Sequence, residues 1–269
     1  MGLEARMQRL SERLVMGVVL SGICAGTVFP LTAQIVQAPT AEEIVARMNA
    51  RDRQRQTALA SYGSERTYRM NYKGPMGDRT AEVVARMDFS APDQKHFTVL
   101  SESGSAVFCH KVLRRMMDGE QEGALQANHL KAMLSAENYH LKLVGEDQID
   151  GVKTWVLEVS PKVNNRFNYK GKVWIGEDDH AVVRIVGSPA RNPSWITSTA
   201  TFDYRYGRQG EFWLPRKDVI VSHVRLGGEV TLTVDYGKYA IVPSQPSVTL
   251  GAMKTGDAPV TVAKASLPQ

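Results

Sequence analysis

The chain has 269 residues, of which 43% are hydrophobic and 23% charged, and its formal net charge is +5 at pH 7. Because its 33 basic residues are interspersed with 28 acidic ones, the charge pattern indicates solvated faces and argues against a nucleic-acid-binding protein. The length would allow two small domains, but an all-β architecture commonly uses about 200 to 250 residues as one unit. We therefore predict a single domain over residues 39–242.

The amino end has the layout of a secretory signal. Arg6, Arg9 and Arg13 precede an almost uncharged run from Leu14 to Leu31, which matches a positive segment followed by an apolar one. We expect export to the periplasm, with residues 1–38 forming a signal peptide. The alternative is an uncleaved N-terminal anchor, because the run is near the lower length limit of a membrane-spanning helix.

A helix is predicted after Thr40. Thr40 and Glu43 form a capping box, in which the threonine hydroxyl accepts from the amide three residues on and the glutamate carboxylate reaches back. Ile44, Val45 and Met48 follow on one face, while the later residues are polar. We expect this helix to dock on a sheet by its first turns.

From Glu65 the hydrophobic period changes from helical to two. Arg66, Tyr68, Met70 and Tyr72 alternate with more polar residues, and after a turn signal at residues 73–78 a second run alternates in the same way. This pattern predicts an antiparallel hairpin with one apolar and one polar face. A third strand is predicted over residues 96–100.

Between Ser105 and Leu134 the alternation stops, and apolar residues recur at helical spacings. We predict one helix near residues 106–118 and a shorter one near residues 128–134. Met116 and Met117 lie on the first of these helices. They are interpreted either as core residues or as an adaptable wall of a ligand cavity, because methionine is flexible and polarisable.

Strand patterns resume at Tyr139 and continue to Tyr236 as runs rich in β-branched and aromatic residues, each bounded by turn residues. In one of these runs Trp155, Leu157 and Val159 share a face. The whole chain is expected to form about ten strands and three helices, followed by a disordered tail over residues 243–269. The predicted runs are 140–144, 153–159, 173–175, 181–186, 199–206, 211–215, 217–226 and 229–236.

The sequence contains no recognisable catalytic motif. Glu177, Asp178, Asp179 and His180 occupy a predicted hairpin turn, where acidic side chains commonly satisfy backbone amides, and we interpret them as a turn rather than a metal site. There is no nucleophile elbow, phosphate-binding loop or dinucleotide-binding glycine pattern. We therefore expect a non-enzymatic protein without catalytic residues, cofactor or metal.

The order of the segments resembles that of a known family. A helix reading AEEIVARMNARDRQRQTALASY is followed by an early hairpin, by GEDQIDGVKTWVLEVSPK and GKVWIGEDDHAVVRIVG, and then by YRYGRQGEFWLPRK and LTVDYGKY. This order, and above all the VWI…VVRI hairpin followed by G-x-FWLP, is similar to the LolA-like superfamily of outer-membrane lipoprotein-sorting proteins. That superfamily also includes LolB and the amino-terminal domain of RseB. The resemblance covers about residues 40–240.

The resemblance implies a mainly β (α+β) fold, in which a curved antiparallel β-meander of about ten strands forms an incomplete barrel with helices over its concave face. It also implies an apolar concavity that holds acyl chains, to which each buried methylene contributes about 0.8 kcal/mol. The expected function is that of a periplasmic carrier for lipoproteins or other acylated, hydrophobic molecules. The alternative is an RseB-like envelope sensor that binds lipid and a membrane protein.

The expected partners are lipoprotein acyl chains or other lipid and an inner- or outer-membrane protein, with no nucleic acid, and the protein is expected to be a monomer. The resemblance makes Arg66 a candidate for the arginine that holds the lid closed in the family's carriers. Ten side chains are candidates for the cavity wall, with core packing as the alternative. They are Trp155, Leu157, Trp174, Phe202, Tyr204, Trp213, Leu232, Val234, Met116 and Met117.

Overall fold

The computed structural model describes residues 38–75, 77–192, 197–225 and 227–244. The predicted export segment, apart from Ala38, and the predicted tail beyond residue 244 lie outside these residues. Among the described helices, none is long and apolar enough to cross a membrane. The fold described below is that of the unit that begins at Pro39.

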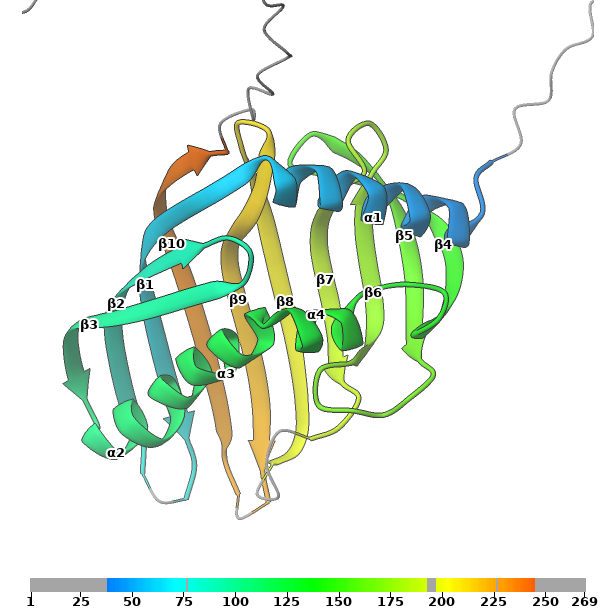
Figure 1. Ribbon diagram of the computed structural model, residues 1–269. Coiled ribbons are helices and arrows are strands. Elements are labelled where there is room, and N and C mark those ends of the chain that lie inside the picture. Colours follow the sequence, from blue (N-terminus) through cyan, green and yellow to red (C-terminus); the bar gives the residue numbers. More distant parts are fainter. Residues whose placement is uncertain (1–37, 76, 193–196, 226, 245–269) are drawn as a thin grey trace, which may run out of the picture. The chain divides into compact units, whose positions relative to one another are not determined.

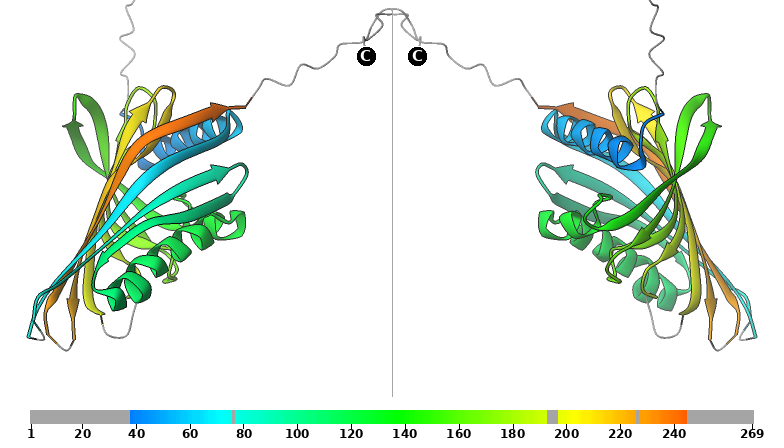
Figure 2. Two further views of the ribbon diagram at one scale, coloured as in Figure 1. Left: turned by 90° about the vertical axis from the view of Figure 1, so that its left-hand side faces the viewer. Right: turned by 90° about the vertical axis from the view of Figure 1, so that its right-hand side faces the viewer.

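Ten antiparallel strands form one sheet in the order β3-β2-β1-β10-β9-β8-β7-β6-β5-β4 (Figure 1). The sheet is strongly curved, and its edge strands β3 and β4 do not pair with each other (Figure 2). This confirms the predicted incomplete barrel. The strands are β1 Leu59–Lys73, β2 Arg79–Ser90, β3 Gln94–Gly104, β4 Tyr139–Ile149, β5 Val152–Pro161, β6 Tyr169–Gly176, β7 Val182–Pro189, β8 Thr197–Gln209, β9 Phe212–Val224 and β10 Glu229–Pro243.

The two faces of the sheet follow from the alternation along each strand. In β1, Arg66, Tyr68 and Met70 are buried, whereas Glu65 and Arg69, which alternate with them, are exposed. Successive side chains of a strand point to opposite faces, so the period of two in the sequence places one set on the inner face. The predicted hairpin of β1 and β2 is confirmed by an unbroken antiparallel register from Ser61–Ser90 to Tyr72–Arg79.

The first helix, α1 (Ala41–Thr57), crosses the inner face near one end of the sheet (Figure 1). Its capping box is present, with the Thr40 side chain accepting from the Glu43 amide and the Glu43 carboxylate accepting from the Thr40 amide. Ile44, Val45 and Met48 are buried against side chains of β4, β5 and β6. The predicted docking of this helix by its first turns is confirmed.

The Thr40→Ala variant is expected to unfold with a free energy about 1 kcal/mol lower than that of the wild type, because an orphan amide of the first turn loses its acceptor. Urea denaturation measures the change. Thr57→Ala is the matched control, since the Thr57 hydroxyl donates to the Arg53 carbonyl at the other end of the helix; there the expected change is below about 0.5 kcal/mol. Equal changes in the two variants would contradict the capping role.

The helical insert is longer than the sequence pattern predicted. It consists of α2 (Ala106–Phe108), a π-helical turn (Cys109–Leu113), α3 (Arg114–Ala124) and α4 (Gln126–Ala132). The first predicted helix therefore continues past Asp118, and the second begins before Asn128. Gly119 and Gly123 did not end α3, because each faces open space and neither adopts a positive φ.

Strand β9 joins two segments that were predicted as separate runs on either side of Pro215. The pairing of β8 with β9 shifts its register between Arg205 and Tyr206, where Tyr206 lies opposite Pro215. An irregularity of this kind accommodates a residue that lacks an amide donor. Strand β10 also continues beyond the predicted end at Tyr236, because its last residues pair with the beginning of β1.

Candidate functional site

The helices create two hydrophobic clusters that share no residue. Cluster 1 lies under α1 and includes Ile44, Leu157 and Ile175, whereas cluster 2 lies under the helical insert and includes Tyr68 and Leu113. Both are packed on the inner face of the sheet, cluster 1 over β4–β6 and cluster 2 chiefly over β1, β2 and β10. The inner face of the middle strands β8 and β9 therefore lies between them.

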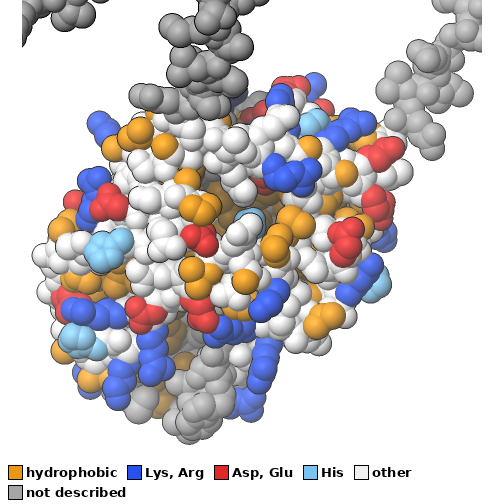
Figure 3. All heavy atoms as spheres, in the orientation of Figure 1, with side chains coloured by type: hydrophobic (Ala, Val, Ile, Leu, Met, Phe, Trp, Pro, Cys, Tyr) orange, Lys and Arg blue, Asp and Glu red, His pale blue; other side chains and the backbone are white. Residues whose placement is uncertain are grey.

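A hollow lies on this face, between α1 and the helices α3 and α4, and orange apolar side chains are visible inside it (Figure 3). The strand register identifies the inner side chains of the middle strands, since Tyr204 pairs with Asp218 and Phe202 pairs with Ile220. None of these side chains belongs to either cluster. We call this region the central hollow and define it by Phe202, Tyr204, Tyr206, Asp218, Ile220 and Ser222.

Two tyrosines indicate that the central hollow reaches deep into the fold. Burial raises the pKa of both Tyr204 and Tyr206, and the nearby Asp218 raises it further. Both residues nevertheless keep part of their surface accessible. Neither residue belongs to a packed cluster, which places both at the border of the central hollow. The Tyr204 ring also stacks on Phe202 with their centroids 4.4 Å apart, which fixes an aromatic floor.

A buried polar network lies beside the central hollow, beneath α3. The Arg66 guanidinium donates through Nη1 to Glu120 of α3, and the Tyr68 hydroxyl donates to the same carboxylate at 2.9 Å. Lys95 Nζ lies 3.8 Å from Glu120. The guanidinium also lies over the Tyr236 ring, 4.7 Å from its centroid. One carboxylate of the helix therefore accepts two hydrogen bonds from β1 and has a cation of β3 beside it.

Arg66 is held in its charged form by this network. Burial is the largest single influence and would lower the pKa of the guanidinium, but Glu120, Tyr68 and Tyr236 together more than offset it, so the pKa is raised. Burial lowers the pKa of Lys95, with Glu120 acting in the opposite direction. A charge can be buried in this way when a partner of opposite sign and hydrogen bonds compensate it.

Asp218 is the second acidic group of the network. Burial raises the pKa of its carboxyl to about 7 from an ordinary value of 3.8; the hydrogen bond from Tyr236 opposes this rise and Glu120 adds to it. The Tyr236 hydroxyl donates to Asp218 Oδ2 at 2.7 Å. The charged or titratable groups that influence Asp218, or are influenced by it, are Arg66, Lys95, Glu120, Tyr204, Tyr206, Tyr236 and Tyr239.

The stability of the protein is expected to fall, relative to an Asp218→Asn variant, as the pH rises from 5 to 7. The folded-state pKa of Asp218 lies above its unfolded value, so its contribution is complete below about pH 4 and is lost as the pH rises through about 7. The slope is at most about 1.4 kcal/mol per pH unit. Urea denaturation of both proteins at each pH measures it, and parallel profiles would contradict the assignment.

Nine of the ten predicted wall residues fall into three groups. Trp155, Leu157, Leu232, Val234, Met116 and Met117 lie in or against the two clusters. Phe202 and Tyr204 face the central hollow. Trp213 lies against the β6–β7 turn, where its indole donates to Asp179.

Trp174 is not a wall residue, which corrects the prediction. Its neighbours Val173 and Ile175 are buried on the inner face, so the alternation of the strand places Trp174 on the outer face. There its indole donates to Asp147 at 3.0 Å, and the Arg184 guanidinium lies 5.2 Å from its ring centroid. It therefore cannot reach the central hollow.

The structure places Arg66 against the helical insert through Glu120. The sequence analysis did not identify Lys95, Glu120, Asp218 or Tyr236. A signal was available for Asp218, since a carboxylate stands at an inward position of an alternating strand, in phase with Ile220 and Ser222. No local signal marks Glu120, because its partner lies 54 residues away in the sequence.

Among the described residues, no three or more His, Cys, Asp or Glu side chains lie together in an arrangement that could hold a metal ion. The segment from Glu177 to His180 forms the predicted turn between β6 and β7, with the His180 amide donating to the Gly176 carbonyl at 3.1 Å.

No family model matches the sequence, and no curated protein matches it. The solved structures that match include members of the superfamily that the sequence resembles. An outer membrane lipoprotein-sorting protein domain from Vibrio parahaemolyticus is 13% identical and has a TM-score of 0.40, with 78% of this chain and 94% of that chain covered. A LolA superfamily protein from Nitrosomonas europaea is 11% identical with a TM-score of 0.35, and the coverage is 80% and 99%.

The MucA/MucB complex from Pseudomonas aeruginosa also matches, at 12% identity and a TM-score of 0.26, with 73% and 93% of the two chains covered. A likeness in fold does not determine what a chain does. The half-barrel and its central hollow therefore rest on the strand order and packing of this chain itself.

Proposed function

We propose that this protein binds hydrophobic molecules in the central hollow and acts as a periplasmic carrier, with acylated lipoproteins or other lipids as cargo. The proposal depends on one observation. The inner side chains of β8 and β9 that define the central hollow belong to neither of the two packed clusters on either side of them. Such a concavity, mostly apolar with a few polar groups at one side, suits a ligand with an acyl chain. Each methylene that leaves water contributes about 0.8 kcal/mol.

Purified mature protein is expected to take up a fluorescent fatty acid saturably and to retain copurified lipid that mass spectrometry detects. The Ile220→Trp variant is expected to lower the affinity at least about tenfold, which corresponds to about 1.4 kcal/mol, because the larger side chain occupies the central hollow. Val221→Trp is the matched control, since Val221 points to the outer face of the same strand.

Equal affinities of the two tryptophan variants would contradict the proposal, as would a wild-type protein that neither binds the fatty acid nor retains lipid. A cooperative thermal transition in both variants is the condition for the comparison. Recovery of a membrane protein from envelope extract, without any bound lipid, would instead support the RseB-like alternative.

A further inference from the structure

Four ionisable side chains from four elements meet at one side of the central hollow. Arg66 comes from β1, Lys95 from β3, Glu120 from α3 and Asp218 from β9. Glu120 contacts the first two directly. Tyr236 links Asp218 to them, because its ring lies against the Arg66 guanidinium and its hydroxyl donates to Asp218 Oδ2 at 2.7 Å. We call these four residues the charged cluster.

The charged cluster has more positive than negative charge. Two cations, Arg66 and Lys95, lie against the one carboxylate of Glu120, and burial raises the pKa of Asp218 to about 7, which reduces its negative charge at slightly acidic pH. The side chains of Lys95 and Glu120 are only 20% and 25% exposed, so water compensates the excess poorly. An uncompensated charge away from water is costly, and a ligand that brings one negative charge would remove this imbalance.

The Arg66 side chain has a donor without an acceptor. The residue is 1% exposed, and its Nη2 atom has no hydrogen-bond partner among the described side chains and backbone. The guanidinium plane is fixed from the sides by the rings of Tyr236 and Phe97, whose centroids lie 4.7 and 5.5 Å away. Nε donates to Ser64 Oγ at 3.5 Å and Nη1 donates to Glu120, so Nη2 is the donor that remains for a carboxylate or a phosphate, to which a guanidinium makes strong charge-assisted hydrogen bonds.

The charged cluster lies next to the apolar side chains of the central hollow. Asp218 pairs across the strands with Tyr204 on one side and with Val234 on the other. The charged cluster therefore borders the central hollow, whose remaining side chains are mostly aromatic or aliphatic. A polar end and an apolar floor in one space suit an amphiphilic molecule.

We propose that the charged cluster is the headgroup site of the central hollow, and that it selects an amphiphile with a single acidic headgroup, whose tail lies along β8 and β9. This inference rests on the proposed carrier function and narrows its ligand class. Lys95 and the free Nη2 of Arg66 bind the headgroup, and the tail supplies most of the affinity.

Three ligands with the same twelve-carbon tail test the inference by titration calorimetry at pH 6.5, each below its aggregation concentration. Dodecanoate is expected to bind about tenfold more tightly than dodecanol, a ratio that corresponds to about 1.4 kcal/mol, and dodecylamine is expected to bind most weakly. In Lys95→Met the preference for the acid over the alcohol should fall about tenfold, while the affinity for dodecanol stays unchanged.

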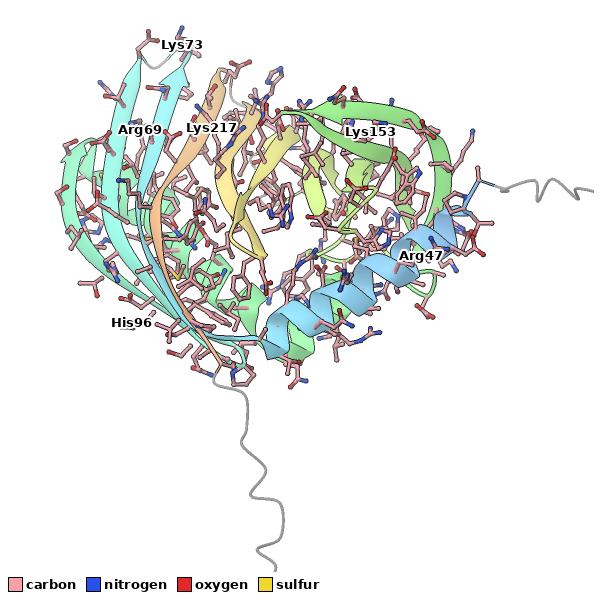
Figure 4. The ribbon with its side chains drawn as sticks, turned by 90° about the horizontal axis from the view of Figure 1, so that it is seen from above. Arg47, Arg69, Lys73, His96, Lys153 and Lys217 are labelled. Carbon is pink, nitrogen blue, oxygen red and sulfur yellow. The ribbon has the colours of Figure 1, made fainter. Side chains whose placement is uncertain are left out.

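Lys217→Met is the matched control. Lys217 is adjacent to Asp218 in the chain but lies on the outer side of the sheet, away from α1, as Arg69 does (Figure 4), and its removal should leave all three affinities unchanged. Equal binding of acid and alcohol by the wild type would overturn the headgroup site while leaving the carrier function in place. Failure of all three ligands to bind would overturn both. The wild-type ratio decides between these outcomes even if Lys95→Met does not fold.

Discussion

The Glu120→Ala variant is expected to unfold with a free energy about 3 kcal/mol lower than that of the wild type. Glu120 accepts from Arg66 and Tyr68, and without it the guanidinium of a residue that is 1% exposed keeps its charge and loses its counter-ion. Most of the expected change is the cost of leaving a buried charge without a partner, and the lost attraction between the two groups contributes less. Urea denaturation measures it.

Glu122→Ala on the same helix is the control. Its carboxylate pairs with Arg166, and the two side chains are 45% and 60% exposed, so the expected change is below about 0.5 kcal/mol. An Arg66→Met, Glu120→Leu double variant should be more stable than Glu120→Ala, because it leaves no buried guanidinium without its counter-ion. A change below about 1 kcal/mol for Glu120→Ala would mean that Arg66 does not depend on α3.

The Ile44→Ala and Leu113→Ala variants are each expected to lose about 3 kcal/mol of unfolding free energy, since both side chains are fully buried and their truncation leaves a cavity. Ile44 belongs to cluster 1 and Leu113 to cluster 2. Because the clusters share no residue, the two losses should add to within about 0.5 kcal/mol in the double variant.

Denaturant titration of the four proteins of this cycle measures the additivity. A coupling above about 1 kcal/mol would show that the clusters contact each other across the inner face, which is incompatible with a hollow between them. Arg47→Ala, on the exposed side of α1, is the control for the helix and should change stability by less than about 0.5 kcal/mol.

The strands were predictable because their signal is local. The alternation of Arg66, Tyr68 and Met70 with exposed residues follows from the pleat of a single strand and needs no knowledge of its neighbours. The same rule would have placed Trp174 on the outer face, opposite to Val173 and Ile175. The size of a tryptophan indicates burial in general but does not indicate the face.

The charged cluster was not predictable, because it depends on register and on the docking of a helix. Arg66 meets Tyr236 through the pairing of β1 with β10, and it meets Glu120 through the placement of α3. Neither relationship has a sequence period. The side chain of Asp218 could be assigned to a face from its strand, but its neighbours could not be named until β8, β9 and β10 were placed side by side.

The pairing of β1 with β10 joins two strands from opposite ends of the domain, and the ion pair of Arg69 with Asp235 across it spans 166 residues. Contacts of such long sequence separation form late, since a large loop must close before they contribute any stability. Strands β1 to β3 can form a meander earlier, but they join β9 only through β10. Arg66 and Lys95 therefore come together with Asp218 only once β1 has paired with β10, and the proposed headgroup site exists only in chains in which this pairing has formed.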